Sequence, residues 1–318
     1  MIVALSLLAY GCSVALLGPR LIMALPAARR APRLGALLWQ IAASSVVATW
    51  AVAGVAMAVP LPALDGLGHL LTSCLTVVHE VAASPRSRAP QVAGLAISVA
   101  VLGRVAGCVA AGAVGRHRRR ARHARMLRIV GRPAPGIGAV VLEHPTAMAY
   151  CLPGRRSQTV LTRGALDILT APQLAAVLAH EDAHLRARHD LALAPIQALT
   201  RAFPRVPLFI AAAREMPVLL EMCADDAAAR RHGPAAVVGA LRSLSTARAP
   251  EGTLAAGGYS AETRIDRLLR PSQRRLSPRF AFSSAVLFFA AGPLLAAAAP
   301  VLVAAATFLG YCPVPSVT

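Results

Sequence analysis

Lysine and asparagine are absent from the 318 residues, so all 33 residues of the Lys and Arg class are arginine. This uniformity is typical of a GC-rich genome, and we do not interpret it as a functional feature. Aromatic residues make up only 4% of the chain and charged residues 15%, whereas apolar residues make up 56%. Such a composition is too apolar for an ordinary soluble domain of this length.

None of the six cysteines has the C-x-x-C spacing, so a zinc site built from cysteines is not expected. Signs of nucleic-acid binding are also absent. The arginine-rich stretch Arg116–Arg128 has no interleaved aromatic residues and no nucleic-acid fold signature beside it. A stretch of this kind directly after an apolar run is typical of a membrane-adjacent patch. We therefore expect anionic lipid, and no nucleic acid, as its partner.

Four apolar runs are long enough to cross a membrane, for which about 20 residues suffice. They are Met1–Gly18, Leu34–Val59, Val92–Val114 and Phe280–Tyr311. The first run lacks the positive residues that precede the apolar core of a cleaved signal peptide, so we interpret it as a membrane helix. The sequence thus predicts a mainly α membrane protein with about four transmembrane helices.

The placement of arginine predicts the orientation of these helices. The loop after the first run and the stretch after the third run are rich in arginine, and the tail after Tyr311 has no charged side chain. Under the positive-inside rule, the arginine-rich segments lie in the cytoplasm. The protein is then a multi-pass protein of the bacterial plasma membrane. Its N-terminus is outside, and the region between the third and fourth helices is cytoplasmic.

One charge interrupts the third run. Arg104 lies near the middle of that run, where a charged side chain is costly and is functional by default. It lines a wet cavity, or it faces the helix bundle and bonds to backbone carbonyls, or the membrane span is shifted along the chain. No acidic partner is evident within the apolar runs, so these alternatives stay open.

These observations divide the chain into three parts. Residues 1–115 hold three transmembrane helices, residues 116–278 form a cytoplasmic domain, and residues 279–318 hold the last transmembrane helix and a short tail. Runs of β-forming residues early in the cytoplasmic part predict a small antiparallel sheet. The predicted strands are about Ala139–Leu142, Ala147–Leu152 and Thr159–Leu161.

Two firm helices follow the predicted strands. The first runs from about Ala171 to Arg188, because Thr170 and Gln173 form a capping box at its start. The second runs over about Pro217–His232, because proline suits a first turn and arginines crowd the last one. Between them, Leu191–Ala213 is apolar but contains three prolines and two arginines, which makes it a poor fifth membrane helix. It is either a membrane-associated helix pair or ordinary core.

The first of these helices carries a candidate metal site. His180 and His184 are four residues apart, so their side chains share one face, a turn apart. Two such imidazoles can bind one zinc ion, and Glu181 beside them can act as general base toward water. A catalytic site needs a third protein ligand. Glu221 on the second helix is the best candidate, and Asp225, one turn on, can hold an imidazole N–H.

The neighbouring polar residues have simpler interpretations. His189 is expected to face solvent or to pack, and Asp182 to face away from the metal. The role of Asp190 stays open, and a salt bridge with Arg186 at the helix end is the simplest account of it.

The motifs LTRGALDILTAPQLAAVLAHEDAH and EMCAD, in this order, resemble the membrane zinc metallopeptidases with an H-E-x-x-H helix and an E-x-x-x-D helix. That group includes the CAAX prenyl proteases and the heat-shock membrane protease. The exit HLRARHD and the order of the apolar runs are most similar to the BlaR/MecR-type peptidases, which cleave antirepressors.

The resemblance implies an α+β zincin-like metallopeptidase domain, inserted between transmembrane helices three and four. It implies one zinc ion per chain, held by His180, His184 and Glu221, with Glu181 as general base. Asp225 would be the carboxylate that accepts a hydrogen bond from a metal-binding imidazole. The resemblance also implies that the strand before the catalytic helix pairs with an extended protein or peptide substrate.

Two departures from these families matter. Relatives usually offer a histidine and an arginine late in the domain to steady the tetrahedral intermediate. Here Arg264 and Tyr259 are the candidates for this oxyanion or substrate contact, without a histidine. The BlaR/MecR sensors also carry a large extracellular domain after the last helix. This chain stops at Thr318, so direct β-lactam sensing is not expected.

The sequence therefore predicts an integral-membrane zinc metalloendopeptidase that acts on protein substrates at the cytoplasmic membrane face. One alternative is a signal-transducing membrane peptidase that cleaves itself or one regulator. Another is a non-catalytic membrane scaffold, against which the complete set of metal and base residues argues.

Overall fold

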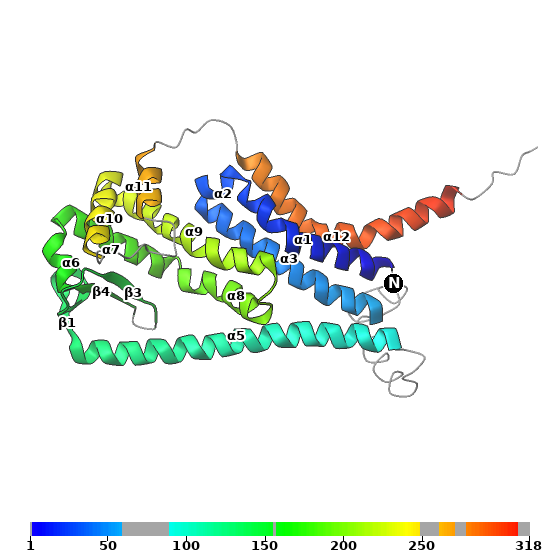
Figure 1. Ribbon diagram of the computed structural model, residues 1–318, viewed down its shortest axis with the longest axis horizontal. Coiled ribbons are helices and arrows are strands. Elements are labelled where there is room, and N and C mark those ends of the chain that lie inside the picture. The colour runs from blue at the N-terminus through cyan, green and yellow to red at the C-terminus, as the bar shows by residue number, and fades with distance from the viewer. Residues whose placement is uncertain (1, 59–88, 155–156, 249–260, 271–277, 311–318) are drawn as a thin grey trace, which may run out of the picture.

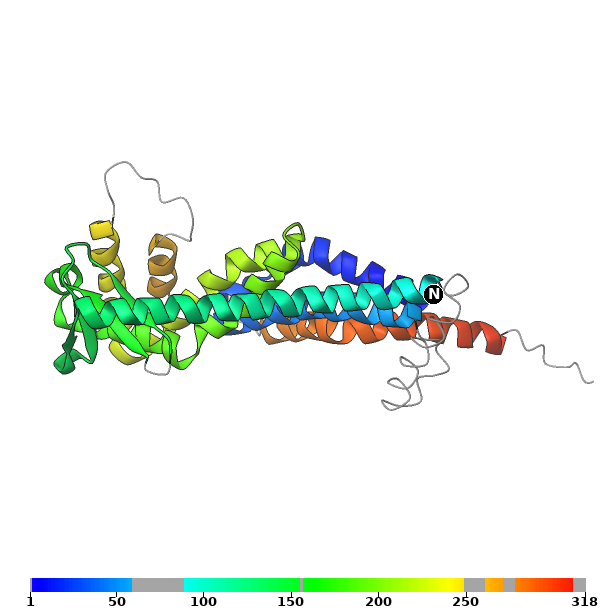
Figure 2. The ribbon, with the colours of Figure 1, turned by 90° about the horizontal axis from the view of Figure 1, so that it is seen from below.

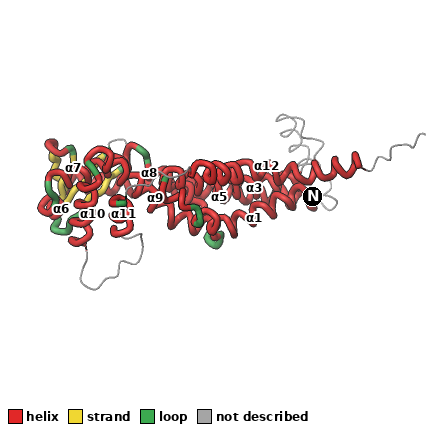
Figure 3. Tube along the Cα trace, turned by 90° about the horizontal axis from the view of Figure 1, so that it is seen from above, coloured by secondary structure: helices red, strands yellow, loops and turns green. Residues whose placement is uncertain are grey.

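The computed structural model describes residues 2–58, 89–154, 157–248, 261–270 and 278–310. The molecule is elongated, with a bundle of long helices at one end and a small sheet with its covering helices at the other (Figure 1). Most of the described chain is helical, and the strands gather at one end (Figure 3).

Among the described residues, three helices are long and apolar enough to cross a membrane: α1 (Ile2–Met23), α3 (Pro32–Ala58) and α5 (Ala89–Val130). They contain the first three predicted runs except for Met1 and Val59, which lie outside the described residues, and the short α2 (Pro26–Arg30) lies between α1 and α3. The fourth predicted run falls within α12 (Pro278–Gly310) except for Tyr311, which lies outside the described residues, and α12 lies beside α1 (Figure 1). Its described apolar part is shorter than the other three.

α5 extends far beyond the predicted third membrane helix. It has 42 residues, so it is about 63 Å long at about 1.5 Å per residue. The stretch Arg116–Arg128 is part of this helix, which continues without a break to the start of the sheet. In Figure 2, α5 runs along most of the molecule. One continuous element therefore connects the apolar bundle to the sheet.

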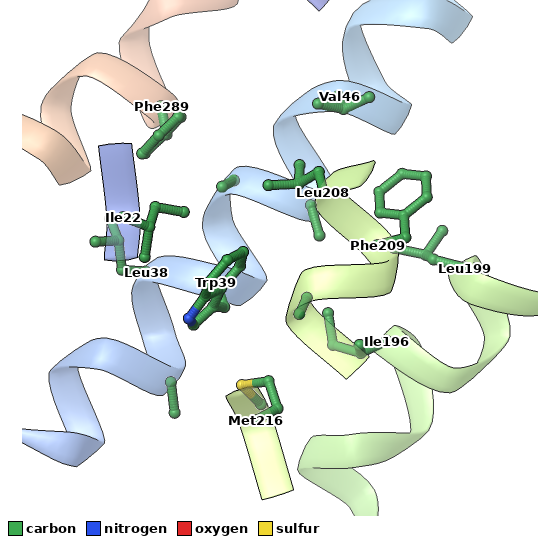
Figure 4. Packing of buried hydrophobic residues seen from close by; sticks show 14 of the residues in the cluster. Ile22, Leu38, Trp39, Val46, Ile196, Leu199, Leu208, Phe209, Met216 and Phe289 are labelled. Atoms are coloured by element: carbon green, nitrogen blue, oxygen red, sulfur yellow. The ribbon is translucent and has the colours of Figure 1, made fainter. Parts of the chain in front are cut away.

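The segment Leu191–Ala213 contributes to two helices, α8 (His189–Ala202) and α9 (Pro207–His232). They form a hairpin whose apolar side chains pack against α1 and α3 (Figure 4). Trp39 of α3 and Phe209 of α9 are both almost fully buried in this cluster. The segment is therefore part of the bundle core. Because α9 also carries Glu221, this packing anchors the predicted ligand to the apolar helices.

The prediction that the second firm helix begins at Pro217 is wrong. α9 begins at Pro207 and runs through Pro217. A proline inside a helix removes a backbone hydrogen bond, which costs stability. The neighbouring Met216 and Leu219 are almost fully buried in the bundle. Burial of each such side chain contributes about 1.5–3 kcal/mol, which is enough to offset the loss.

Arg104 lies beside the tip of the α8–α9 hairpin. Its Nε donates a hydrogen bond to the carbonyl oxygen of Ala202, the last residue of α8. Carbonyls at a helix C-terminus lack partners within the helix and carry a partial negative charge. Of the alternatives for Arg104, the structure favours the one in which it bonds to a backbone carbonyl.

The sheet has four strands. Their spatial order is β1 (Gly131–Ala134), β2 (Ala139–Leu142), β4 (Gln158–Thr162) and β3 (Ala149–Leu152). The three predicted strands are present, with ends that differ by at most two residues. The prediction of a purely antiparallel sheet is wrong, because β2 and β4 are parallel. The two outer pairs, β1 with β2 and β3 with β4, are antiparallel.

The parallel pair arises because the chain crosses from β2 to the far edge of the sheet before it returns as β4. A Cβ atom on Gly164 would lie 1.8 Å from the carbonyl oxygen of Pro145, so only glycine fits at this crossing. The buried Thr162 hydroxyl donates to the Thr146 carbonyl and accepts from the Met148 N–H, at 2.8 and 2.9 Å. These contacts hold β3 at the edge.

α7 (Ala171–Arg186) packs on one face of the sheet. The predicted capping box is confirmed, since the Thr170 N–H donates to Gln173 Oε1 at 3.0 Å. α7 ends at Arg186, two residues before the predicted end at Arg188. The remaining helices around α7 and α9 are α6 (Arg163–Ile168), α10 (Pro234–Arg248) and α11 (Ala261–Leu269).

Candidate metal centre

The two predicted histidine ligands lie near the C-terminal end of α7. Leu174, Val177 and Leu178 pack this helix on the sheet, which leaves an adjacent face of α7 for the histidines. The Nε2 atoms of His180 and His184 approach each other at 3.1 Å. The helical spacing therefore directs both imidazoles to one point.

α9 packs beside α7 and brings Glu221 to the same point. Glu221 Oε2 lies 3.4 Å from Nε2 of His180, and Glu221 Oε1 lies 3.3 Å from Nε2 of His184. The Glu221 side chain is 40% exposed, whereas the two imidazoles are 14% and 17% exposed. The cluster is therefore open to solvent on the Glu221 side.

The two imidazoles and the Glu221 carboxylate have the spacing that a tetrahedral zinc ion requires. Zinc binds nitrogen and oxygen ligands at about 2.0–2.1 Å, so two ligand atoms on a tetrahedron lie about 3.3 Å apart. Here the two Nε2 atoms are 3.1 Å apart, and each lies 3.3 or 3.4 Å from a different oxygen of Glu221. The donor set of His180, His184 and Glu221 thus fits zinc. Three protein ligands leave the fourth position of the tetrahedron for water or substrate.

Asp225 lies behind His180, on the side away from the cluster. Its Oδ1 is 3.1 Å from His180 Nδ1, and its side chain is 1% exposed. Arg264 of α11 donates to both Asp225 oxygens, at 2.7 and 2.6 Å. Arg264 Nη1 also lies 3.1 Å from Glu221 Oε2. Asp225 therefore holds the His180 ring with Nε2 toward the cluster, as carboxylates behind metal-binding histidines do.

The charges in this network keep both carboxylates ionised. Burial raises the pKa of Asp225, but hydrogen bonds from Arg264 and His180 outweigh it and lower that pKa to about 2. Burial also raises the pKa of Glu221, and the hydrogen bond from His180 and the charge of Arg264 lower it to about 2. Two negative groups therefore surround the point where the ligand atoms meet.

The two histidines have opposite pKa shifts. Burial lowers the pKa of His180, but the hydrogen bonds and charges of Asp225 and Glu221 outweigh burial and raise that pKa to about 9. For His184 burial prevails, and its pKa falls to about 4. The carboxylates that stabilise positive charge at His180 would also stabilise a metal cation bound there.

His189 lies behind His184 in the place that Asp225 takes behind His180. It is 8% exposed, so it does not face solvent. Its Nδ1 is 2.9 Å from Nδ1 of His184, and the two rings meet edge to face. A histidine that binds metal through Nε2 carries its proton on Nδ1 and needs an acceptor there. His189 provides that acceptor, and the sequence pattern alone did not indicate it.

Glu181 faces the edge strand β3 and is 9% exposed. Cys151 of β3 donates to the Glu181 carboxylate from its backbone N–H and its thiol. Burial raises the pKa of Glu181. Burial, together with the negative charge of Glu181, raises the pKa of the Cys151 thiol to about 12. A buried carboxylate with a raised pKa, fixed by two donors, suits a general base.

Two aspartates near the motif pair with arginines instead of joining the cluster. Asp182 faces away from it, as predicted, and pairs with Arg186 at 2.8 Å and Arg231 at 2.9 Å. The simplest account of Asp190, a salt bridge with Arg186, is wrong. Asp190 pairs with Arg120 of α5, which lies beside the start of α8.

Of the two candidates for an oxyanion contact, Tyr259 lies outside the described residues. The Arg264 guanidinium is directed at Asp225 and Glu221. This geometry gives Arg264 a positioning contact with the cluster, and its contact with substrate stays a prediction. α11 also carries Arg267, which lies three residues before Arg270. Arg267 pairs with Asp226 through two hydrogen bonds of 2.8 Å.

The geometry can be compared with known families. Residues 115–256 match the model of peptidase family M48. The match includes the sheet, the α7 helix with His180 and His184, and the α9 helix with Glu221. This match supports a metallopeptidase of the M48 type in this part of the chain. The predicted recognition of a metallopeptidase with these motifs is confirmed at this level, and the closer relation to BlaR/MecR-type peptidases stays a prediction. No curated protein and no solved structure matches the chain.

The limits of the M48 match differ from the limits of the site. The matched segment begins within α5 and ends before α11, so Arg264 lies outside it. Arg264 nevertheless contacts both Asp225 and Glu221. The metallopeptidase domain of this chain is therefore completed by a residue from beyond the matched segment.

Proposed function

We propose that this protein is an integral-membrane zinc endopeptidase that hydrolyses protein substrates at the cytoplasmic membrane surface. The observation that carries the proposal is the triangle of ligand atoms on His180, His184 and Glu221, with Glu181 buried beside it. A zinc ion held there would polarise a substrate carbonyl and lower the pKa of water to about 7.

The protein's own residues transfer the proton and position the groups of the site. Glu181 accepts the proton of the attacking water and then donates it to the leaving amine. Cys151 keeps the Glu181 carboxylate in place through its N–H and thiol. Asp225 and His189 each hold one imidazole at Nδ1, which leaves both Nε2 atoms for the metal.

The edge strand supports the assignment as an endopeptidase. β3 pairs with β4 alone among the described strands, and its Cys151 touches Glu181. An extended chain can add to such an edge through main-chain hydrogen bonds, which tolerate many sequences. Because an added strand needs no free terminus, an internal segment of a protein can be cleaved there.

The apolar helices and the distribution of arginine support this location of the site. α1, α3 and α5 are long and apolar enough to cross a membrane, and we assign α12 as the fourth crossing helix. The positive-inside rule then puts the peptidase domain in the cytoplasm. Arg118, Arg125 and Arg128 of α5 are exposed, and we assign them to anionic lipid at the membrane surface.

A second candidate function, signal transduction through cleavage of the protein itself or of one regulator, is favoured by α5. This helix is continuous from the apolar bundle to β1, and its Arg120 pairs with Asp190. Asp190 follows His189, which contacts the metal-binding ring of His184. A displacement of α5 would thus alter the position of His184 through two contacts, Arg120 with Asp190 and His189 with His184. The two candidates share the same chemistry and differ in the number of substrates and in whether α5 controls cleavage.

The test of the proposed activity compares the wild type with Glu181→Ala, both as the full chain purified in detergent. We expect both proteins to contain about one zinc ion per chain and only the wild type to cleave casein at internal bonds. A wild type without zinc would contradict the proposal, and so would equal cleavage by both proteins.

The orientation needs its own measurement. Cys223 is buried and is a poor reporter, whereas Ser157 is exposed beside the sheet. We expect Ser157→Cys to react with a membrane-impermeant maleimide only after the cells are opened, relative to the wild type. Additional labelling of Ser157→Cys in intact cells would put the peptidase domain outside.

A further inference from the structure

An open cleft of about 520 Å³ lies between α5 and the edge strand β3. It is lined by Arg119, Arg120, Arg122, His123, Met126, Tyr150 and Leu152. The Tyr150 hydroxyl and His123 Nε2 are 2.8 Å apart, and this contact joins the strand to the helix. The spacing between the two sides of the cleft is therefore fixed where the contact forms.

The cleft is positively charged. Arg120 is neutralised by Asp190. Arg119 and Arg122 are exposed, and neither has an acidic partner among the described residues. No carboxylate is among the residues that line the cleft. Two unneutralised guanidinium groups in an open cleft attract carboxylates, with which arginine forms paired, charge-assisted hydrogen bonds.

The cleft lies on the opposite face of β3 from the catalytic base. Side chains alternate along a strand, so Tyr150 and Leu152 face α5 while Cys151 faces α7 and Glu181. A substrate strand added to the β3 edge would alternate in the same way. Some of its side chains would face the metal centre, and those between them would point toward Arg119 and Arg122.

We propose that this cleft is a subsite for acidic side chains, and that Arg119 and Arg122 make the peptidase select extended segments with Asp or Glu at alternate residues. The inference rests on the proposed peptidase function and adds the substrate class. The arginine-rich part of α5 then has two roles, the binding of acidic substrate side chains and the binding of anionic lipid. Arg119 and Arg122 are three residues apart and share the face toward β3.

Arg118 and Arg125 provide a matched control on the same helix. They are seven residues apart and exposed, and neither lines the cleft, although Arg122 lies within about one turn of both. Changing either pair to glutamine removes the same number of charges from exposed positions. The two double variants therefore differ in whether the residues that lose their charge line the cleft.

The experiment uses quenched fluorescent decapeptides on one sequence frame, with Glu or Gln at each position in turn. We expect the full-length wild type to cleave the Glu peptides about tenfold faster in kcat/KM at two positions separated by one neutral position. Arg119→Gln with Arg122→Gln should reduce this ratio to below about threefold by slowing only the Glu peptides. Arg118→Gln with Arg125→Gln should keep the ratio.

Binding of the same peptides to Glu181→Gln, measured by fluorescence anisotropy, separates this inference from the activity on which it rests. A preference for Glu peptides in binding, with no cleavage by the wild type, would overturn the peptidase proposal and support the subsite. The inference is overturned if Glu and Gln peptides are bound and cleaved equally, or if both double variants lose the preference equally. Loss of co-purifying phosphatidylglycerol in the Arg119 and Arg122 variant, with unchanged peptide preference, would assign the cleft to lipid instead.

Discussion

Asp225→Asn removes one negative charge from behind the metal centre with almost no change in shape. Asp225 accepts two hydrogen bonds from Arg264 and faces Nδ1 of His180. Asparagine cannot accept both arginine bonds and hold the imidazole in the same way. We therefore expect the variant to bind zinc about 10- to 100-fold more weakly, the usual cost of losing a partner behind a metal ligand.

The same substitution should lower the free energy of unfolding by about 3 kcal/mol, the lower end of the range for breaking a buried ion pair. The lower end applies because Arg264 keeps a second acidic neighbour, Glu221, at 3.1 Å. Adding Arg264→Gln removes the unpaired charge, so the double variant should regain most of the stability. It should not regain the zinc affinity, because His180 still lacks its carboxylate.

Asp226→Asn is the matched control, one residue further along α9. Asp226 forms the same two-bond pair with an arginine, Arg267, but the pair is away from the ligands and its side chains are 32% and 22% exposed. We expect Asp226→Asn to lower the free energy of unfolding by about 1 kcal/mol at most and to leave the zinc affinity unchanged. Zinc competition with a chromophoric chelator and thermal unfolding in detergent measure both quantities. Equal zinc affinities in Asp225→Asn and Asp226→Asn would refute the reasoning.

Three further predictions follow from the same contacts. His189→Ala should weaken zinc binding about tenfold, because His184 loses the acceptor at its Nδ1, and an unchanged affinity would contradict that role. Chelation should lower the thermal midpoint, and zinc at a thousandfold excess over Kd should restore about 4 kcal/mol of stability, whereas magnesium should restore none. Thr162→Val should cost about 2 kcal/mol in unfolding measurements, because the Met148 and Ala165 N–H groups lose their acceptor, and Thr162→Ser should cost much less.

The parts of the site that depend on local spacing could be predicted from the sequence. The capping box fixes the start of α7, and the four-residue spacing puts His180 and His184 on one face. Glu221 followed from chemistry, because a third ligand was required and few acidic residues lie downstream. The structure brings Glu221 and Asp225 to the two histidines as expected.

His189 could not be predicted because the chain changes direction before it. Arg188 has a left-handed backbone with φ 49°, and α8 begins at the next residue. The helical angle per residue that relates His180 to His184 therefore does not apply to His189. The partner of Asp190 was missed for a related reason, since Arg120 is distant in sequence and meets it only through the packing of α5 on α8.

β1 escaped prediction because its residues, Gly131–Ala134, contain a proline and no run of β-forming residues. The strand forms because α5 ends at Val130 and delivers the chain beside β2. Gly131 suits this approach, since a Cβ atom there would lie 2.5 Å from a methyl carbon of Val140. Tertiary placement, and not local propensity, makes this segment a strand.

The central claim is that His180, His184 and Glu221 together hold one zinc ion. Zinc K-edge X-ray absorption on the purified wild type tests it most directly. The account predicts a first shell of nitrogen and oxygen at about 2.0–2.1 Å, with the outer-shell scattering of two imidazoles, and the loss of one imidazole in His184→Ala. A shell that contains sulfur, or a wild-type spectrum unchanged in His184→Ala, would contradict it.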